Sequence, residues 1–331
     1  MASGKLLRQL IKAGLEGDQD LVRAASTEVI AEERGKNHHL LAQDLERLLY
    51  AEYAPKDRAP RNGKTLHLVS ALPTSKDSGL PLVEHRSVVR DERDLVLSDS
   101  TRSSIEDLLQ EHNRSDLLAA FGLQPARKLL FFGPPGCGKS LAAEVIANSL
   151  SLPLIVVRLD SLISSFLGET AANLRKVFDY FTQNAVVGLF DEVDALAKDR
   201  GDSADHGELK RSVNAVLQMM DGYRGPSILI ATTNYEALLD KAVWRRFDEA
   251  VRFEMPNTEQ IKRLLALKLS GVRQNFEPTD TGVASLFKGL SHADIERVLR
   301  RAVKDMVLAG REFLEKSNLD AALAKEHRSG H

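Results

Sequence analysis

Eight consecutive residues, 133–140, have the types and spacing of a loop that binds phosphate groups. Their sequence, GPPGCGKS, matches the pattern G-x-x-x-x-G-K-[ST]; it follows an apolar run and precedes a helical pattern over Leu141–Leu150. Glycines let backbone N–H groups surround phosphates closely, and a following helix N-terminus adds a favourable partial positive charge. In this pattern Lys139 would reach the β- and γ-phosphates of a nucleotide and Ser140 would bind Mg²⁺. The predicted nucleotide-binding residues here are Gly133, Pro134, Pro135, Gly136, Cys137, Gly138, Lys139, Ser140 and Leu141.

Two carboxylates follow another apolar run, Val186–Phe190. A buried strand ending there would deliver Asp191 and Glu192 to the edge of a sheet where open α/β folds bind ligands. Asp191 would hold the Mg²⁺, directly or through water, and Glu192 would polarise the attacking water. An Asp-Glu pair after a strand is more often the start of a solvated loop, but beside a phosphate loop the catalytic interpretation is favoured.

The strands and helices that must position these groups can be predicted from the pattern of apolar residues along the chain. Short apolar runs alternate with helical patterns, which predicts a parallel sheet buried on both faces. The predicted strands are Leu129–Phe132, Leu154–Val157, Val186–Phe190, Ile228–Ala231 and Ala250–Phe253. After Pro256 the pattern is helical, over 258–270, 281–288, 291–309 and 317–326. We therefore expect an α/β P-loop fold, 95–255, followed by a small helical lid, 256–331.

The N-terminal third has a different character. Residues 1–54 show three short amphipathic stripes, which predict three short helices that could form a small bundle. Because such helices are only marginally stable in isolation, docking on a partner is the other expectation. Residues 55–94 are assigned to a linker because proline and glycine recur up to Pro81, and residues 82–97 could not be assigned to a helix or strand. A helix is expected from about Ser103 to Ala120.

Two later segments make the pattern specific. Residues 228–234, ILIATTN, and 240–248, DKAVWRRFD, occur in the order of the sensor-1 strand and the second region of homology of the AAA ATPases, within the wider AAA+ class. The chain resembles this family over about residues 95–310. The resemblance implies ATP and Mg²⁺ as ligands, a water-orienting role for Asn234, and a role for Arg245 and Arg246 as arginine fingers on ATP held by a neighbouring subunit.

Arginine fingers that act on a neighbouring subunit's ATP would require several copies of the chain to assemble. Guanidinium groups stabilise the charge on transferring phosphoryl oxygens. A head-to-tail interface that closes is needed to complete every site, and the resemblance implies a homo-oligomer, usually a hexamer. Without the surrounding pattern, an arginine pair is more often a solvent-facing surface feature.

A further segment lies where the family carries a pore loop that grips polypeptide. Residues 164–170, SSFLGET, place Phe166, Leu167 and Gly168 at the aromatic, aliphatic and glycine positions. An apolar pair can hold an extended chain without reading its sequence. The alternative is that Phe166 packs in the core, and Ser165 stands where many members have Lys or Arg. Residues 202–207 lie where a second pore loop would be, although a solvated loop is the better interpretation there.

Several positions depart from the family pattern. His292 replaces the glycine of a Ser-Gly-Ala-Asp stretch in the lid and is itself a candidate nucleotide contact. Residues 97–100 do not match the family's adenine-flanking Asp-Val-Gly-Gly. Trp244, before the arginine pair, is interpreted as a packing or interface residue. Cys137 is interpreted as a small residue that the turn tolerates, although a thiol at a helix N-terminus can be reactive.

Composition narrows the function classes. The chain has 331 residues, with 43% hydrophobic and 28% charged residues, typical of a globular protein. Its net charge of −2 and the lack of a basic strip with interleaved aromatics disfavour a nucleic-acid motor. A single cysteine, no apolar run of membrane length and no signal peptide indicate a cytoplasmic protein without a membrane partner.

Composition and motifs together leave two candidate functions. The first is a ring that remodels or threads protein clients recruited through residues 1–54. The alternative is a regulatory ATPase whose nucleotide state switches a companion protein without threading.

Overall fold

The structure is a computed structural model that describes residues 26–28, 71–75, 79–162, 169–196, 215–236 and 244–329. The chain divides into two compact units, Met1–His67 and Leu68–His331. In the first unit the described residues, 26–28, are helical. The second unit contains the phosphate loop, both carboxylates and the lid.

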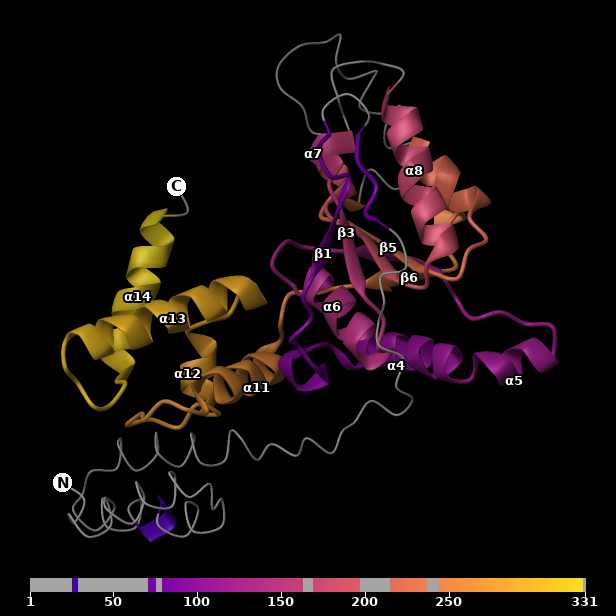
Figure 1. Ribbon diagram of the computed structural model, residues 1–331. Helices are drawn as coiled ribbons and strands as arrows, with labels where there is room; N and C mark the ends of the chain where they lie inside the picture. The colour runs from indigo at the N-terminus through magenta and orange to yellow at the C-terminus, as the bar shows by residue number, and fades with distance from the viewer. Residues whose placement is uncertain are drawn as a thin grey trace, which may run out of the picture. The chain divides into compact units, whose positions relative to one another are not determined.

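The second unit is built on a sheet of six strands in the order β1-β3-β4-β5-β2-β6 (Figure 1). Strands β2 to β6 run parallel to their neighbours, and β1 pairs antiparallel with β3, with Val83 opposite Val157. The strands are β1 (Val83–Arg86), β2 (Lys128–Phe132), β3 (Leu154–Val157), β4 (Val187–Phe190), β5 (Ile228–Thr233) and β6 (Glu249–Arg252). The predicted α/β fold with a helical lid is confirmed, with one antiparallel edge strand added.

Helices cover both faces of this sheet. The first face packs against α4 and α6, and the second packs against α8 and the helical residues 215–222. Helices and short 3-10 turns in this part are η1 (Glu92–Asp94), α4 (Asp99–Asn113), α5 (Ser115–Ala120), α6 (Lys139–Ser149), α7 (Leu159–Leu162), α8 (Glu169–Gln183) and η2 (Val193–Leu196).

The central strands are buried on both sides because their side chains alternate between the two faces. On β2, Leu129 and Phe131 join the core beneath α6, whereas Leu130 joins the core beneath α8. On β5, Ile230 and Ala231 divide in the same way. Such continuous apolar strands cannot lie at the surface, so the polar residues that follow them mark where the chain reaches the edge of the sheet.

The lid consists of four helices with a core of their own, shown in orange to yellow in Figure 1. They are α11 (Thr258–Leu269), α12 (Thr281–Ser285), α13 (His292–Leu308) and α14 (Lys316–Ser329). Capping boxes begin two of them: Asn257 with Gln260 at α11, and Ser291 with Asp294 at α13. The second box makes His292 the first residue of α13, which decides where its side chain lies.

Two local predictions need correction. Strand β1 lies inside 55–94, the range expected to be a linker, because VEHR carries no apolar alternation and gains its hydrogen bonds from β3. The helix expected over 103–120 begins at Asp99, where Ser98 caps it, and is divided at Arg114 into α4 and α5. Neither the cap nor the break interrupts the helical pattern of the sequence.

Candidate nucleotide site

The phosphate loop joins β2 to α6, and two of its glycines make approaches that a side chain would block. A Cβ atom at Gly133 (φ +131°) would lie 2.0 Å from the backbone oxygen of Phe253, beside β6. A Cβ atom at Gly136 (φ +72°) would lie 2.5 Å from the Ser291 hydroxyl of the lid. The Ala293 N–H donates to the Gly136 carbonyl at 3.0 Å. Glycine at these positions therefore lets the loop turn and lets the lid pack directly on it.

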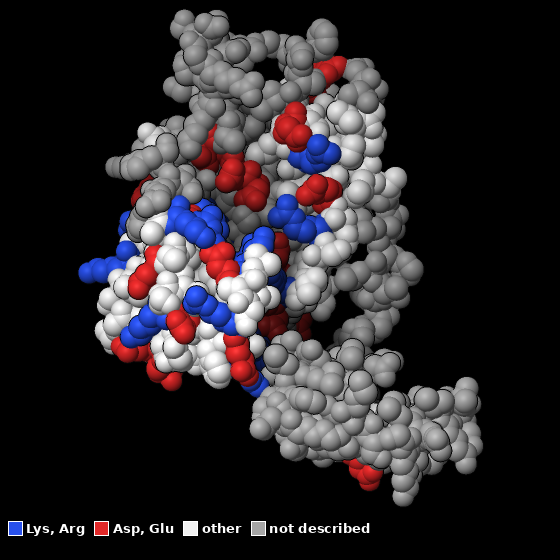
Figure 2. Space-filling view, turned by 90° about the vertical axis from the view of Figure 1, so that its left-hand side faces the viewer, with Lys and Arg blue, Asp and Glu red and all other residues white. Residues whose placement is uncertain are grey.

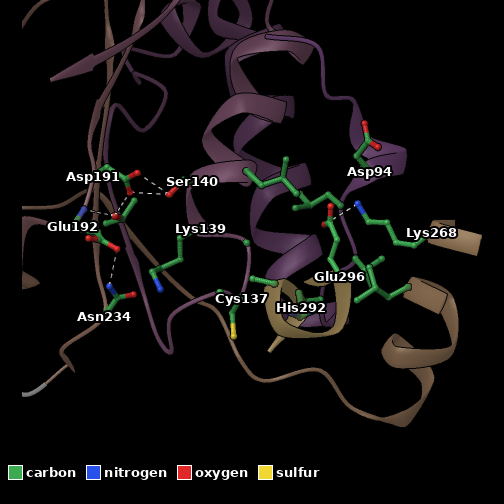
Figure 3. A pocket seen from close by; sticks show the side chains of 18 residues that line it. Asp94, Cys137, Lys139, Ser140, Asp191, Glu192, Asn234, Lys268, His292 and Glu296 are labelled. Carbon is green, nitrogen blue, oxygen red and sulfur yellow. Dashed lines mark hydrogen bonds and ion pairs between the residues drawn. The ribbon is translucent and has the colours of Figure 1, made fainter. Parts of the chain in front are cut away.

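Lys139, the first residue of α6, is buried inside this loop. Its Nζ donates to the carbonyls of Gly133 and Pro134, both at 2.8 Å. Burial lowers the pKa of Lys139 from its ordinary value. The ammonium group is thus held among carbonyls at the N-terminus of a helix, next to the cavity that the loop lines (Figure 3).

Ser140 and Asp191 meet across the sheet edge. The Ser140 hydroxyl donates to both carboxylate oxygens of Asp191, at 2.8 and 3.0 Å (Figure 3). One residue comes from the start of α6 and the other from the end of β4. A hydroxyl beside a carboxylate supplies the hard oxygen donors that Mg²⁺ prefers, so these two residues fit such an ion.

Glu192 is held by two residues from the end of β5. Its backbone is left-handed (φ +53°), and its N–H donates to the Thr232 hydroxyl at 2.8 Å. The same hydroxyl donates to Asp191 at 2.7 Å, and Asn234 Nδ2 donates to the Glu192 carboxylate at 3.3 Å. Thr232 therefore links both carboxylates, and Asn234 contacts the one expected to act on water.

Substituting Thr232 tests this link. Thr232→Val conserves volume but removes the hydroxyl, and we expect kcat for ATP hydrolysis to fall about 10- to 100-fold, as loss of two hydrogen bonds implies. Steady-state kinetics should show a much smaller change in KM. Thr232→Ser should restore most of kcat, and Thr233→Val, its equally buried neighbour, serves as the control. If Ser is as slow as Val, the hydroxyl does not position the carboxylates.

The lid and the segment before α4 form the other end of the cavity. Its lining there includes Leu95, Val96, Leu264, His292 and the ion pair between Lys268 and Glu296, which is 3.0 Å long (Figure 3). The segment 97–100 is not part of this wall: Leu97 is buried in the core and Ser98 caps α4. The wall is instead formed by Leu95 and Val96, which directly precede that segment.

Cys137 lines the cavity with its thiol buried. Its Sγ lies 3.7 Å from the Pro135 carbonyl and from the sulfur of Met255. Burial raises the pKa of the thiol, which outweighs the opposing effect of Lys139. A thiol with a raised pKa carries little reactive thiolate, so Cys137 is a packing residue rather than an activated one.

The two arginines predicted to be fingers lie outside this cavity. Arg245 is exposed, and Arg246 is half-buried with Nη1 unpaired among the described residues. Neither lines the cavity. Trp244 packs edge-on against Phe132, with ring centroids 4.8 Å apart, which confirms a packing role.

The structure brings most of the predicted site residues together. Those that line the cavity are Gly136, Cys137, Gly138, Lys139, Ser140, Leu141, Asp191, Glu192, Asn234 and His292. Residues 163–168, which include Phe166, Leu167 and Gly168, and residues 197–214 lie outside the described residues. Sequence reasoning missed Thr232, Lys268 and Glu296, because a threonine in a strand and charges on a helix face carry no signal of their own.

The comparisons with known proteins agree with this geometry. Residues 129–255 match the family described as "ATPase family associated with various cellular activities (AAA)". Over 328 residues the chain is 39% identical to a Sinorhizobium fredii protein named "Uncharacterized AAA family ATPase y4kL", covering 99% of this chain and 96% of that protein. The chain belongs to the AAA family. It is an ATPase, and a nucleotide is its substrate.

More distant AAA relatives carry a more specific name. The "Proteasome-activating nucleotidase" of Methanococcus maripaludis is 30% identical over 288 residues, which are 83% of this chain and 69% of that protein. The protein of the same name from Thermococcus gammatolerans is 31% identical over 264 residues, which are 75% of this chain and 64% of that protein. In the part of this AAA protein that the structure describes, no helix is long and apolar enough to span a membrane.

Proposed function

We propose that this chain is a Mg²⁺-dependent ATPase that assembles into a closed hexameric ring of identical subunits and remodels protein substrates. The observation that carries the proposal is the composition of the cavity. Among the described residues that line it, the cations are Lys139 and Lys268, and no arginine is present. Arg245 is exposed elsewhere on the chain, which supports a finger that completes a neighbour's site.

Within one site the residues divide the chemistry among them. Lys139 binds the β- and γ-phosphates, and Ser140 with Asp191 holds the Mg²⁺, which neutralises charge on the phosphate oxygens. Glu192 polarises the attacking water, and Asn234 orients that water or the Glu192 carboxylate. The hydrogen bonds among Ser140, Asp191, Thr232 and Glu192 support this assignment, because they hold the metal ligand and the base in one connected network.

A protein substrate is favoured over a nucleic acid. Figure 2 shows basic and acidic side chains interspersed over the face that carries the lid helices, without a continuous basic patch on that face. Many of these charges are paired, for example Lys325 with Asp305 at 2.8 Å and Arg301 with Glu326 at 3.2 Å. Nucleic-acid binding depends on cations that are free to contact phosphates. Two relatives named for activating a proteasome add support for a role in protein handling.

The pore loop supplies the contact with substrate in this proposal. By resemblance, Phe166, Leu167 and Gly168 belong to the loop that grips polypeptide in the central channel, while residues 1–54 recruit the client or companion protein. Phe166→Ala should abolish ATP-dependent unfolding of a client with an unstructured tail, measured as loss of fluorescence from a tagged fluorescent protein. ATPase activity without client should remain within about twofold, because Phe166 is not one of the residues predicted to bind or hydrolyse the nucleotide.

Phe166→Tyr, which keeps an aromatic ring, is the matched variant and should retain unfolding. An Ala variant that still unfolds the client would contradict gripping by this loop. If the wild-type protein unfolds no client but alters a companion protein's activity in an ATP-dependent way that Phe166→Ala leaves unchanged, the regulatory-switch function replaces threading.

A further inference from the structure

A second cavity, the amino-edge cavity, lies at the amino-terminal edge of the sheet, opposite the edge that carries the nucleotide cavity. Its volume is about 460 Å³, and none of its lining residues lines the nucleotide cavity. Because Lys128 begins β2 and Phe132 ends it, the walls of the two cavities are about one strand length apart, on the order of 15 Å. The charged residues of the amino-edge cavity come from α4, from the start of β2 and from the residues before β5 and β6: Glu111, Arg127, Lys128, Arg224 and Asp248.

Both carboxylates of this wall already have partners. Oδ2 of Asp248 accepts from the N–H groups of Arg127 and Lys128, both at 2.9 Å, and Oδ1 lies 3.3 Å from the Lys128 ammonium. Glu111 accepts from the Ala126 N–H at 2.9 Å. The two acidic side chains therefore fix the start of β2 and pair with Lys128, and the guanidinium of Arg127 forms no ion pair with the described residues.

The guanidinium of Arg127 is only partly satisfied. Its Nη1 donates to the Gly225 carbonyl at 2.7 Å, whereas among the described residues Nε is buried without a partner and Nη2 makes no hydrogen bond. The N–H groups of Nε and Nη2 point in the same direction from one edge of the planar group, and they match the two oxygens of a carboxylate. A buried cationic donor that has lost water without gaining an acceptor is costly. This edge of Arg127 therefore calls for an anion.

Arg224 places another cation at the same wall. It is exposed, and its Nη1 donates to the carbonyls of Asp221 and Tyr223 at 3.0 and 2.7 Å, so the backbone holds its guanidinium there. No acidic side chain among the described residues pairs with it. Counted over the described residues of the wall, three cations stand against two carboxylates, which leaves one positive charge in excess.

The excess charge and the free edge of Arg127 together indicate the class of ligand. One carboxylate would cancel the excess, whereas a phosphate monoester carries a charge of about −1.5 to −2 and would reverse it. Pro125 and Ala126 add small apolar side chains to the wall, and a cavity of this size is in the range that holds small molecules. We propose that the amino-edge cavity binds a small organic acid, whose carboxylate accepts hydrogen bonds from Nε and Nη2 of Arg127 and lies near Arg224. Because this site is separate from the nucleotide site, the inference goes beyond the proposed function and holds whether the chain remodels proteins or switches a partner.

The test measures binding of acetate, butyrate, succinate and glutarate to the full chain with Mg²⁺-ADP bound. Saturation-transfer NMR at constant ionic strength should show at least one acid that binds with a Kd of about 1 mM or tighter, while its uncharged amide analogue does not bind. Arg127→Met should weaken this binding about 10- to 100-fold, the effect of losing hydrogen bonds to a charged group. Arg127→Lys keeps the charge without the planar edge and should restore only part of the affinity. Arg224→Gln should weaken binding about 2- to 5-fold, because that guanidinium is exposed.

Arg263→Met, a change at an exposed arginine of α11, is the control and should leave acid binding unchanged. Every variant should bind ADP as the wild type does, which shows that it folds; if Arg127→Met fails this check, Arg127→Lys and Arg224→Gln decide the outcome. Unchanged acid binding in folded Arg127 variants, or no binding by any of the acids, would overturn the proposal. Binding that occurs only without ADP would also overturn it, because the acid would then occupy the nucleotide site. Tighter binding of inorganic phosphate or of a polyglutamate peptide, if it depends on Arg127, would replace the small acid by a phosphate group or by an acidic protein segment.

Discussion

We expect the Glu192→Gln protein to bind Mg²⁺-ATP with wild-type affinity and to hydrolyse it at least 100 times more slowly. The substitution keeps the size of the side chain and the hydrogen bond to Asn234, which is 3.3 Å long. It leaves Asp191 and Ser140, the proposed metal ligands, untouched. It removes the negative charge that draws a proton from water, and general bases contribute about 10²- to 10⁴-fold to rate. Calorimetry with ATP and phosphate-release kinetics measure the two quantities.

The control for this substitution is Glu259→Gln, the same chemical change at an exposed lid residue paired with Lys262. It should leave both binding and turnover unchanged. Turnover by Glu192→Gln within threefold of the wild-type rate would show that Glu192 is not the base. Asp191→Asn should give a different result: ATP binding itself should weaken, because this substitution removes a proposed Mg²⁺ ligand.

The second large effect is expected at Arg245. Arg245→Ala should bind ADP normally but lose about 10²- to 10³-fold in ATP hydrolysis, because its guanidinium stabilises charge on phosphoryl oxygens held by the adjacent subunit. Its exposure and its position outside the cavity lead to this expectation. Arg311→Ala, another exposed arginine, which pairs with Glu315 at 3.9 Å, is the control and should retain full activity.

Mixing two inactive proteins distinguishes a finger in trans from a local effect. An Arg245→Ala subunit keeps a complete set of site residues, and a Glu192→Gln subunit keeps its finger. Where the second donates a finger to the first, an active site is restored, so mixtures should regain part of the wild-type rate. Absence of recovery at every mixing ratio, or wild-type specific activity that is independent of dilution, would contradict the proposed assembly.

The phosphate loop and the two carboxylates could be predicted from the sequence because each is a local pattern. Residues 133–140 and 191–192 directly follow the apolar runs Leu129–Phe132 and Val186–Phe190, and runs of this kind form strands that are buried on both faces of a sheet. Parallel strands then bring their carboxyl ends to one edge. The meeting of Ser140 with Asp191, 51 residues away in the chain, follows from that geometry.

Other parts of the site rest on contacts that leave no local pattern. In the sequence Thr232 is indistinguishable from the other residues of a buried strand. It links the two carboxylates because the pairing of β4 with β5 brings its hydroxyl between Asp191 and the Glu192 N–H. Strand β1 has mixed charges and becomes a strand only through its hydrogen bonds to β3. The wall at Leu95 and Val96 depends on where the lid packs.

By itself the sequence determined the α/β fold, the positions of its main strands along the chain, the four lid helices, the phosphate loop and the two carboxylates after β4, since these depend on apolar periodicity and on glycine, lysine and carboxylate spacing. The tertiary structure alone decided that Thr232 joins the two carboxylates, that the thiol of Cys137 is buried, and that His292 faces the cavity. These properties depend on distances and burial between segments far apart in the chain, and hydrophobic periodicity carries no information about them.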